Sequence, residues 1–409
     1  MTLLVMLGVM GATMLIYRLS QSQFGTQGFS ELSIVKRIIA FMVPLMAIGM
    51  GVGVPREVAR IDRTEMDETK YEILRNSLLI TFILIAALFL IIVLFSGFLT
   101  ELFFGDRKYH YLLFPMAISL QGLLLNSLAY SYFRGLTSFP TSNWLQAVNH
   151  IFCPILVIFF LCKDIPSYLT LWGFLSSLVS LSFLGNHIFK LKGKFLSYQA
   201  LIKVTVYSLR RLPGDIALQM IFVIPPILCA HMVDFKSAGD VAFSLTILTL
   251  ITVPLSPVSL IMLPKTMSLL NKGRTEILMK ITGDVFLYIT IGSAILSIIL
   301  FWVAEPAILI FLPGRKDFDF FILKAVTLVV LPYSSYIYLR SFIDALHEKA
   351  YNSFNCIFSL FIFLSTVGLL GHLISTQVGL ASGLVLGFYT LGILTYSRVR
   401  MDRRSLVQT

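Results

Sequence analysis

A stripe of polar side chains runs along the otherwise apolar residues 144–161 and their N-terminal flank. Asn143, Gln146, Asn149 and His150 follow one another at helical spacing, so one face of a helix would carry all four. Polar groups on an apolar helix either hydrogen-bond to neighbouring helices or line a polar cavity. The stripe therefore predicts either interhelical contacts or a ligand-binding face, and both interpretations stay open at this point.

Opposite charges lie four residues apart at two places, Arg211 with Asp215 and Arg340 with Asp344. This spacing allows an ion pair along a helix. Each pair either holds its helix in place or rearranges as the protein changes state, and the sequence alone leaves both alternatives open.

Arg37, with Lys36 beside it, is ionisable within or next to the apolar residues 34–54. A charge inside hydrocarbon is costly, so such groups reach back to the headgroups or face a cavity. For Lys36 we weigh the two alternatives equally. For Arg37 we favour a packed or cavity-lining position.

Prolines interrupt two of the apolar stretches at matching places. Gly28 and Gly239 are 211 residues apart, and Pro44 and Pro254 are 210 apart. An offset near half the chain length indicates duplication of one unit. Because proline removes a backbone hydrogen bond, we predict matched kinks at Pro44 and Pro254, used for bending between two states.

The composition places the whole chain in a membrane. Of its 409 residues, 57% are hydrophobic and 13% charged, with a mean hydropathy of +0.87. A soluble domain carries about 25% charged residues. Apolar runs of about 20 residues, the length that crosses the hydrocarbon, predict an all-α bundle of twelve transmembrane helices, near residues 2–17, 34–54, 77–98, 111–131, 144–161, 168–189, 212–231, 240–262, 284–303, 320–341, 351–373 and 378–396.

The basic residues predict the orientation. With both termini on the inner side, the inner segments hold 21 of the 32 Lys and Arg residues and the outer loops hold 7. The positive-inside rule then places both termini in the cytoplasm. The formal net charge of +11 is spread over several inner loops, which argues against a nucleic-acid partner.

The repeat divides the chain into two six-helix bundles, residues 1–195 and 196–409. The sequence carries no nucleotide-binding loop, no zinc-protease motif and no nucleophile elbow, and its four cysteines are scattered in apolar segments. We therefore predict a protein that is not an enzyme, has no cofactor and no metal site, and works as a secondary transporter made of two repeats.

The start of the chain differs from the corresponding place in the second half. Helix 2–17 has no basic residue before it, whereas Lys203 and Arg210 precede helix 212–231. A first membrane helix usually has such a flank. We expect about 10–20 polar and basic residues to precede Met1 in the full gene product, as the symmetry of the halves suggests.

The order of several short motifs resembles a known family. Tyr17-Arg18 through Gly25, Gly28-Phe29, and the run from Val43-Pro44 to Pro55-Arg56 are similar to the opening of Wzx-type polysaccharide-biosynthesis flippases. SYFRGLTSF, residues 131–139, is similar to a later segment of these proteins. They belong to the multidrug/oligosaccharidyl-lipid/polysaccharide exporter superfamily, whose architecture is two bundles of six helices.

The resemblance implies flipping of an undecaprenyl-pyrophosphate-linked oligosaccharide across the bacterial cytoplasmic (inner) membrane, for O-antigen or other lipopolysaccharide synthesis. Partners would be the lipid-linked oligosaccharide, membrane lipids, and a polysaccharide polymerase with its assembly proteins. Arginine forks suit a pyrophosphate, and the polar stripe suits sugar hydroxyls. The candidate phosphate ligands are Arg37, Arg134, Arg210 and Arg211. Arg134 occupies the family's Arg-Gly position, where gating or capping of a loop is the alternative role.

Two other functions compete with the flippase. A cation-coupled multidrug exporter of the same superfamily needs a carboxylate in its bundles. Asp215, Asp284 and Asp344 lie within or just at the ends of the predicted helices, all near inner ends, and we expect this scarcity of carboxylates to favour an anionic substrate. A scaffold of a polysaccharide assembly complex, without transport, is the third possibility. The sequence does not identify the sugar, the coupling ion or the oligomeric state.

Overall fold

A computed structural model describes most of the chain. The described residues are 2–60, 67–188, 212–255, 272–347 and 351–408, together with Val258, Met262, Lys265, Thr266 and Leu269. The chain divides into two compact units, Met1–Leu212 and Pro213–Thr409. The boundary predicted after residue 195 lies outside the described residues, as do Arg210 and Arg211.

Unit 1 is built only of helices in its described part. Its elements, in chain order, are α1 (Thr2–Met46), α2 (Met50–Arg60), α3 (Asp67–Phe104), the short η1 (Arg107–Leu112), α4 (Leu113–Gly135), α5 (Phe139–Ala147), η2 (Val148–Phe152), α6 (Cys153–Leu156), η3 (Val157–Leu161) and α7 (Ile165–Ile188). The segments α5 to η3 follow one another without a gap and form one continuous membrane-length helix, Phe139–Leu161.

Helix α1 contains two membrane spans. Its 45 residues would measure about 67 Å, more than twice the hydrocarbon thickness. Gly25 leaves the helical conformation, with φ 66° and ψ −165°. The Lys36 ammonium lies 5.1 Å from the centre of the Tyr17 ring, although 19 positions of straight helix would hold them about 28 Å apart. The chain therefore folds back at Gly25, and unit 1 has six spans.

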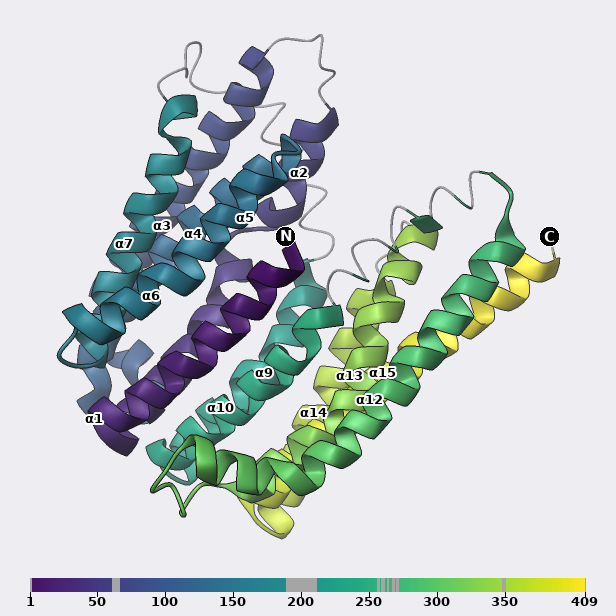
Figure 1. Ribbon diagram of the computed structural model, residues 1–409. Helices are drawn as coiled ribbons and strands as arrows, with labels where there is room; N and C mark the ends of the chain where they lie inside the picture. Colours follow the sequence, from purple (N-terminus) through teal and green to yellow (C-terminus); the bar gives the residue numbers. More distant parts are fainter. Residues whose placement is uncertain are drawn as a thin grey trace. The chain divides into compact units, whose positions relative to one another are not determined.

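The described part of unit 2 also contains six membrane spans. Its described elements are α9 (Leu212–Met232), α10 (Phe235–Thr252), the short η4 (Val253–Leu255), α12 (Thr275–Phe311), α13 (Phe320–Leu346), α14 (Tyr351–Leu373) and α15 (Thr376–Gln408). Within each unit the long helices lie side by side along roughly one direction (Figure 1). The prediction of an all-α protein with two halves of six helices is confirmed.

Backbone geometry preserves the internal repeat. Gly105 follows the third span of unit 1 with φ 75°, and Gly314 follows the third span of unit 2 with φ 91°. Both lie in the left-handed region, which a side chain disfavours and glycine tolerates. The two glycines are 209 residues apart, in agreement with the offsets of the sequence repeat.

Regular α-helix ends near both predicted kinks. In unit 1 the helix stops at Met46, two residues after Pro44, and resumes at Met50. Between them Ile48 and Gly49 have φ 44° and 70°. In unit 2 Pro254 lies in the 3₁₀ turn that follows α10. Each interruption lies near a proline, which has no N–H for the helical hydrogen bond. The use of these places in a conformational change stays a prediction.

Small residues allow close packing between neighbouring helices. A side chain at Gly122 of α4 would overlap the backbone of Gly173 in α7. In unit 2, a Cβ added at Gly383 of α15 would lie 2.6 Å from a methyl group of Val367 in α14. Glycine repeats of this kind are typical of membrane helix pairs, where backbones approach closely.

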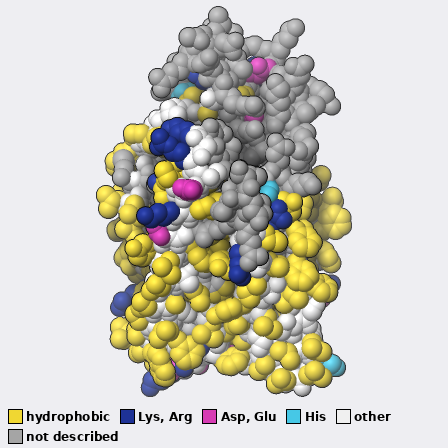
Figure 2. Space-filling view, turned by 90° about the vertical axis from the view of Figure 1, so that its right-hand side faces the viewer, with side chains coloured by type: hydrophobic (Ala, Val, Ile, Leu, Met, Phe, Trp, Pro, Cys, Tyr) yellow, Lys and Arg dark blue, Asp and Glu magenta, His cyan; other side chains and the backbone are white. Residues whose placement is uncertain are grey.

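The surface is that of a multi-pass membrane protein. Eleven helices of the described chain are long and apolar enough to span a bilayer, and α1 counts once although it folds back. Trp302, Ile310 and Phe160 are each at least 75% exposed. Figure 2 shows one face on which hydrophobic side chains form a broad band. Such a surface belongs in lipid rather than water.

Candidate functional site

The predicted polar stripe joins a hydrogen-bond network inside unit 1. Asn149 donates to Asn126 Oδ1 on α4 at 2.8 Å and to Ser180 Oγ on α7 at 3.4 Å. His150 Nε2 lies 3.0 Å from Asn126 Nδ2, and Trp172 Nε1 donates to the Asn149 carbonyl at 3.1 Å. The two central members of the stripe therefore connect three helices.

The other two members of the stripe lie apart from this network. Asn143 is buried and donates to Thr2 Oγ1 at 3.2 Å. Gln146 is half-buried. The structure thus brings together Asn149 and His150 in one network and leaves Asn143 outside it. Asn143 ties the middle of α5 to the start of α1.

A local change of helix type positions the stripe. Residues Val148–Phe152 form a π-helical turn, in which the Cys153 N–H donates to the Val148 carbonyl five residues earlier. Pro154 has no N–H and so cannot form the regular α-helical bond to His150. A π turn of this kind is frequent at functional sites, because it shifts side chains around the helix axis.

Lys36 lies inside unit 1 against aromatic faces. Its ammonium is 5.1 Å from the centre of the Tyr17 ring and 5.6 Å from that of Trp172. Aromatic rings attract a cation through their negative faces, more strongly when water is excluded. Trp172 therefore connects Lys36 to the Asn149 network. Arg37, the next residue, is 6% exposed and lies in the core of the unit.

A carboxylate that the sequence analysis missed is buried in α1. Glu31 is 5% exposed, and its Oε1 accepts hydrogen bonds from Tyr111 Oη at 2.6 Å and Gln27 Nε2 at 3.0 Å. Both donors are neutral. Among the residues that the structure describes, Glu31 has no ion-pair partner. The predicted helix began at residue 34, so Glu31 had been assigned to a loop.

Arg134 lies in the last turn of α4, and the Gly135 that follows it has a packing role. The Arg134 guanidinium is half-buried and lies 5.5 Å from the centre of the Tyr130 ring. A Cβ added at Gly135 would lie 2.7 Å from Val58 Cβ and 2.9 Å from Pro55 Cα. The Arg-Gly motif thus places a cation at a helix C-terminus, which the helix dipole favours, and lets α2 pack against α4.

In unit 2 the corresponding arginine is fully paired. Arg340 of α13 forms an ion pair with Asp215 of α9 at 2.8 Å and lies 3.8 Å from Asp344. Asn352 of α14 donates to Asp344 Oδ1 at 2.8 Å. Both predicted (i, i+4) carboxylates thus meet one guanidinium. Gly214 lets α9 approach α14 closely at this place, because any side chain there would overlap Ser353 of α14.

A second ion pair, which is buried, joins α10 to the loop before α13. Arg315 and Asp240 pair through side chains that are 1% and 2% exposed. The Asp319 N–H donates to the same carboxylate at 3.2 Å. At the surface of this cluster, the Lys236 ammonium pairs with Asp317 and lowers the pKa of that carboxyl, while burial raises the pKa of Asp319. The sequence places Arg315 among the basic residues of the outer loops, but its side chain is buried against Asp240.

One signal in the sequence would have linked the two arginines. Tyr130, Tyr132 and Arg134 have the spacing of Tyr336, Tyr338 and Arg340, at an offset of 206. The shared Tyr-x-Tyr-x-Arg marks equivalent positions at the end of the fourth span in each unit. Within the described part of the chain, no group of three or more His, Cys, Asp or Glu side chains could hold a metal ion.

Comparison with known proteins identifies the fold. No protein-family model and no curated protein matches the chain. An inward-facing multidrug resistance MATE family transporter of the MOP superfamily superposes with a TM-score of 0.81 at 14% identity, over 100% of this chain and 99% of that one. Its outward-facing conformation gives 0.67 at 14% identity, over 100% and 95%.

A third structure widens the range of functions within this fold. A MOP superfamily transporter from Pyrococcus furiosus, described as having a binding pocket of reversed polarity, superposes with a TM-score of 0.71 at 13% identity, over 100% of this chain and 96% of that one. The chain therefore has the fold of these transporters. At such low identity the likeness extends to the fold and not to the substrate.

Proposed function

We propose that the protein is a secondary transporter that exports an amphiphilic compound by alternating access, coupled to uptake of a proton or another cation at Glu31. Similar structures adopt inward-facing and outward-facing conformations. The sequence has no nucleotide-binding loop, which leaves an ion gradient, the membrane potential or the substrate gradient as the energy source, and we favour an ion gradient. This coupled exporter replaces the flippase as the function that the observations favour.

The observation that carries the proposal is the environment of Glu31. A buried carboxylate is costly unless it is paired, protonated or bound to a cation. Tyr111 and Gln27 supply hydrogen bonds but no positive charge. Glu31 therefore binds a proton or cation in one state of the transport cycle and releases it in another. The expectation that carboxylates are scarce in the bundles is corrected, because Glu31 and Asp240 are both buried within helices.

The substrate class follows from the relatives of the fold. Structures that superpose over the whole chain are described as multidrug resistance transporters, which suggests a lipophilic organic molecule. Transport of ethidium by the full-length protein in proteoliposomes tests this. We expect a pH or sodium gradient to drive uptake, and Glu31→Gln to abolish the dependence on the gradient while the protein still folds.

The control for this experiment is Glu101→Gln. Glu101 is another carboxylate of unit 1, but it is about half-exposed and paired with Arg107 at 3.2 Å. We expect this variant to transport like the parent protein. Gradient-driven transport that persists in Glu31→Gln would remove Glu31 from coupling, and the response to pH as against sodium distinguishes the two cations.

A second candidate function, flipping of a pyrophosphate-linked oligosaccharide, rests on Arg134. Its guanidinium contacts the Tyr130 ring, and among the described residues it has no carboxylate partner. A free fork of N–H donors suits a pyrophosphate. Binding of farnesyl pyrophosphate to the purified protein tests this function. We expect Arg134→Ala to lose binding and Arg134→Lys to retain part of it; equal binding by all three proteins would exclude the role.

We further propose that the membrane is the bacterial cytoplasmic membrane, with both termini in the cytoplasm. This orientation rests on the bias of the basic residues. Cysteine labelling from outside the cell tests it at Lys108, Lys316 and Lys272, which are all exposed. We expect reaction at Lys108→Cys and Lys316→Cys and none at Lys272→Cys, and the opposite pattern would reverse the orientation.

A further inference from the structure

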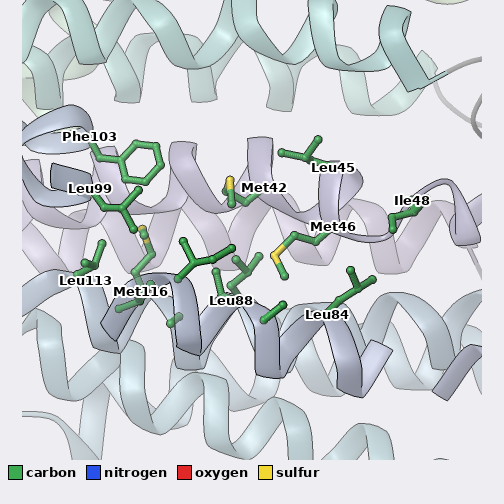
Figure 3. A pocket seen from close by; sticks show the side chains of 15 residues that line it. Met42, Leu45, Met46, Ile48, Leu84, Leu88, Leu99, Phe103, Leu113 and Met116 are labelled. Carbon is green, nitrogen blue, oxygen red and sulfur yellow. The ribbon is translucent and has the colours of Figure 1, made fainter. Parts of the chain in front are cut away.

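An apolar slot lies inside unit 1, between the second half of α1, α3 and α4. Its volume is about 260 Å³, and all 15 side chains that line it are apolar (Figure 3). They include Met42 and Met46 of α1, Leu84 and Leu99 of α3, and Met116 of α4. Neither Glu31 nor Arg134 lines the slot, so it is separate from the groups that carry the proposed function.

The lining residues on α3 run from Leu84 to Phe103. Between them the helical geometry is interrupted at Phe95, with φ −121° and ψ 22°. Figure 3 shows Phe103, Leu99 and Leu113 at one end and Leu84 and Ile48 at the other.

The two ends of the slot differ in chemistry. Beyond Phe103 lies an exposed charged loop, where Arg107 pairs with Glu101 at 3.2 Å and Lys108 pairs with Asp106 at 3.1 Å. Exposed pairs of this kind are weak and exchange partners readily. At the opposite end Ile48 lies in the break between α1 and α2, with φ 44°. The slot thus runs from a charged mouth to an apolar floor.

The occupant must match this arrangement. Water has no polar partner in such a cavity, and an empty space would leave the lining side chains without dispersion contacts. The helices stand in hydrocarbon, and Ile91 at the edge of the slot is 47% exposed. We propose that the slot holds one acyl chain of a bilayer phospholipid, with the lipid phosphate at the mouth beside Arg107 and Lys108.

Photo-crosslinking tests the proposal with the full-length protein in nanodiscs. The probe is phosphatidylglycerol that carries a diazirine near the end of one acyl chain, and mass spectrometry locates the labelled residues. We expect label on slot residues such as Met46 and Leu88. Val93 and Phe98, which are 71% and 64% exposed on the same helix, should take up less.

Two neighbouring alanines of α3 provide a matched pair of variants. Ala87 lines the slot, whereas Ala86 is exposed. Ala87→Trp fills the slot and should reduce its labelling roughly fivefold or more, because a packed interior has no room for both groups. Ala86→Trp adds the same side chain outside and should leave the labelling unchanged. Leu99→Phe adds less volume and serves if Ala87→Trp does not fold.

Three results would overturn the proposal. Label spread evenly over the exposed residues of α3 would show general contact with lipid. Equal labelling of Ala86→Trp and Ala87→Trp would place the lipid elsewhere. Label from a diazirine-bearing polyprenyl phosphate but not from the phospholipid would assign the slot to an isoprenoid chain. None of these outcomes depends on transport, so the test is independent of the proposed coupling at Glu31.

Discussion

The two units bury charged groups at related places but neutralise them differently. In unit 2, Asp240 pairs with Arg315, and Arg340 pairs with Asp215. In unit 1, Glu31 has only neutral hydrogen-bond donors, and the charge of Arg134 faces only a tyrosine ring, within the described residues. A paired charge holds helices together, whereas an unpaired one is available to a proton, an ion or a substrate.

This difference assigns separate tasks to the two repeats. Breaking a buried ion pair leaves one uncompensated charge and costs several kcal/mol, so the pairs of unit 2 should matter for folding. Among the described residues, Glu31 and Arg134 have no ion-pair partner to lose, so their removal should affect transport more than stability. Substitutions in each unit, followed by the midpoint of unfolding in detergent, compare how much the charged groups of the two units stabilise the protein.

The largest effect should come from Arg315. Arg315→Leu leaves Asp240, which is 2% exposed, without its cation, and should lower the free energy of unfolding by about 3–5 kcal/mol. The double variant Asp240→Leu/Arg315→Leu removes both charges and should recover much of this loss. Glu31→Leu in unit 1 should cost less than Arg315→Leu. A larger loss in Glu31→Leu would show that unit 1 depends on its carboxylate for folding.

The next effect concerns the two equivalent arginines. Arg340→Ala removes a guanidinium that binds Asp215 and Asp344, and should cost about 1.5–3 kcal/mol. We expect the lower part of this range, because the Asp215 side chain is 40% exposed. Arg134→Ala leaves no carboxylate behind and should change stability by under about 0.5 kcal/mol. Equal losses would remove the proposed difference between the units.

The same unfolding experiment should rank the polar networks of the two units by how much each stabilises the protein. Asn149 is fully buried and bonds to two side chains, whereas Asn355 of unit 2 makes one long side-chain contact, 3.5 Å to Thr395. Hydrogen bonds between membrane helices are worth about 0.6 kcal/mol on average and up to about 1.7. Asn149→Leu should fall near the upper value and Asn355→Leu near the average. The reverse order would show that the Asn149 network stores strain.

The sequence predicted the fold because hydrophobic length and repeat offsets are properties of single segments. The twelve apolar runs, the two halves and the interruptions near Pro44 and Pro254 required no knowledge of neighbours. The site was less predictable. Arg340 lies 3.8 Å from Asp344 at the predicted spacing of four residues. Asp215 was expected to pair with Arg211, which lies outside the described residues, but it pairs with Arg340 of α13 at 2.8 Å.

Glu31 was missed for a different reason. The polar residues on both sides of Gly25 are helical, so hydropathy placed the start of the second helix too late and left Glu31 outside it. Its partner Tyr111 is 80 positions away, and only the fold brings the two together. Asn126 and Ser180 were overlooked because the polar residues near them are small or few and follow no spacing pattern that marks one face.

The smallest effect concerns the exposed ion pairs of the two loops. The Lys236 ammonium on α10 lowers the pKa of Asp317 below its ordinary value of 3.8. The two residues of this pair are 81 positions apart in the sequence. In unit 1 the backbone and side chain of Lys108 lower the pKa of Asp106 in the same way, but only two positions away. A carboxyl whose pKa is lowered by folding stabilises the protein above its unfolded pKa. That stability is lost as the pH falls through the folded pKa.

Since Asp317 is 53% exposed, the contribution should be about 0.2–1 kcal/mol. We expect Asp317→Asn to reduce the unfolding midpoint slightly at pH 7 and to match the parent protein at a pH well below the lowered pKa of Asp317, where both carry a neutral side chain. Asp106→Asn should have a smaller effect at both pH values, because its pair closes no long loop. A constant difference between Asp317→Asn and the parent at all pH values would assign the effect to packing instead of charge.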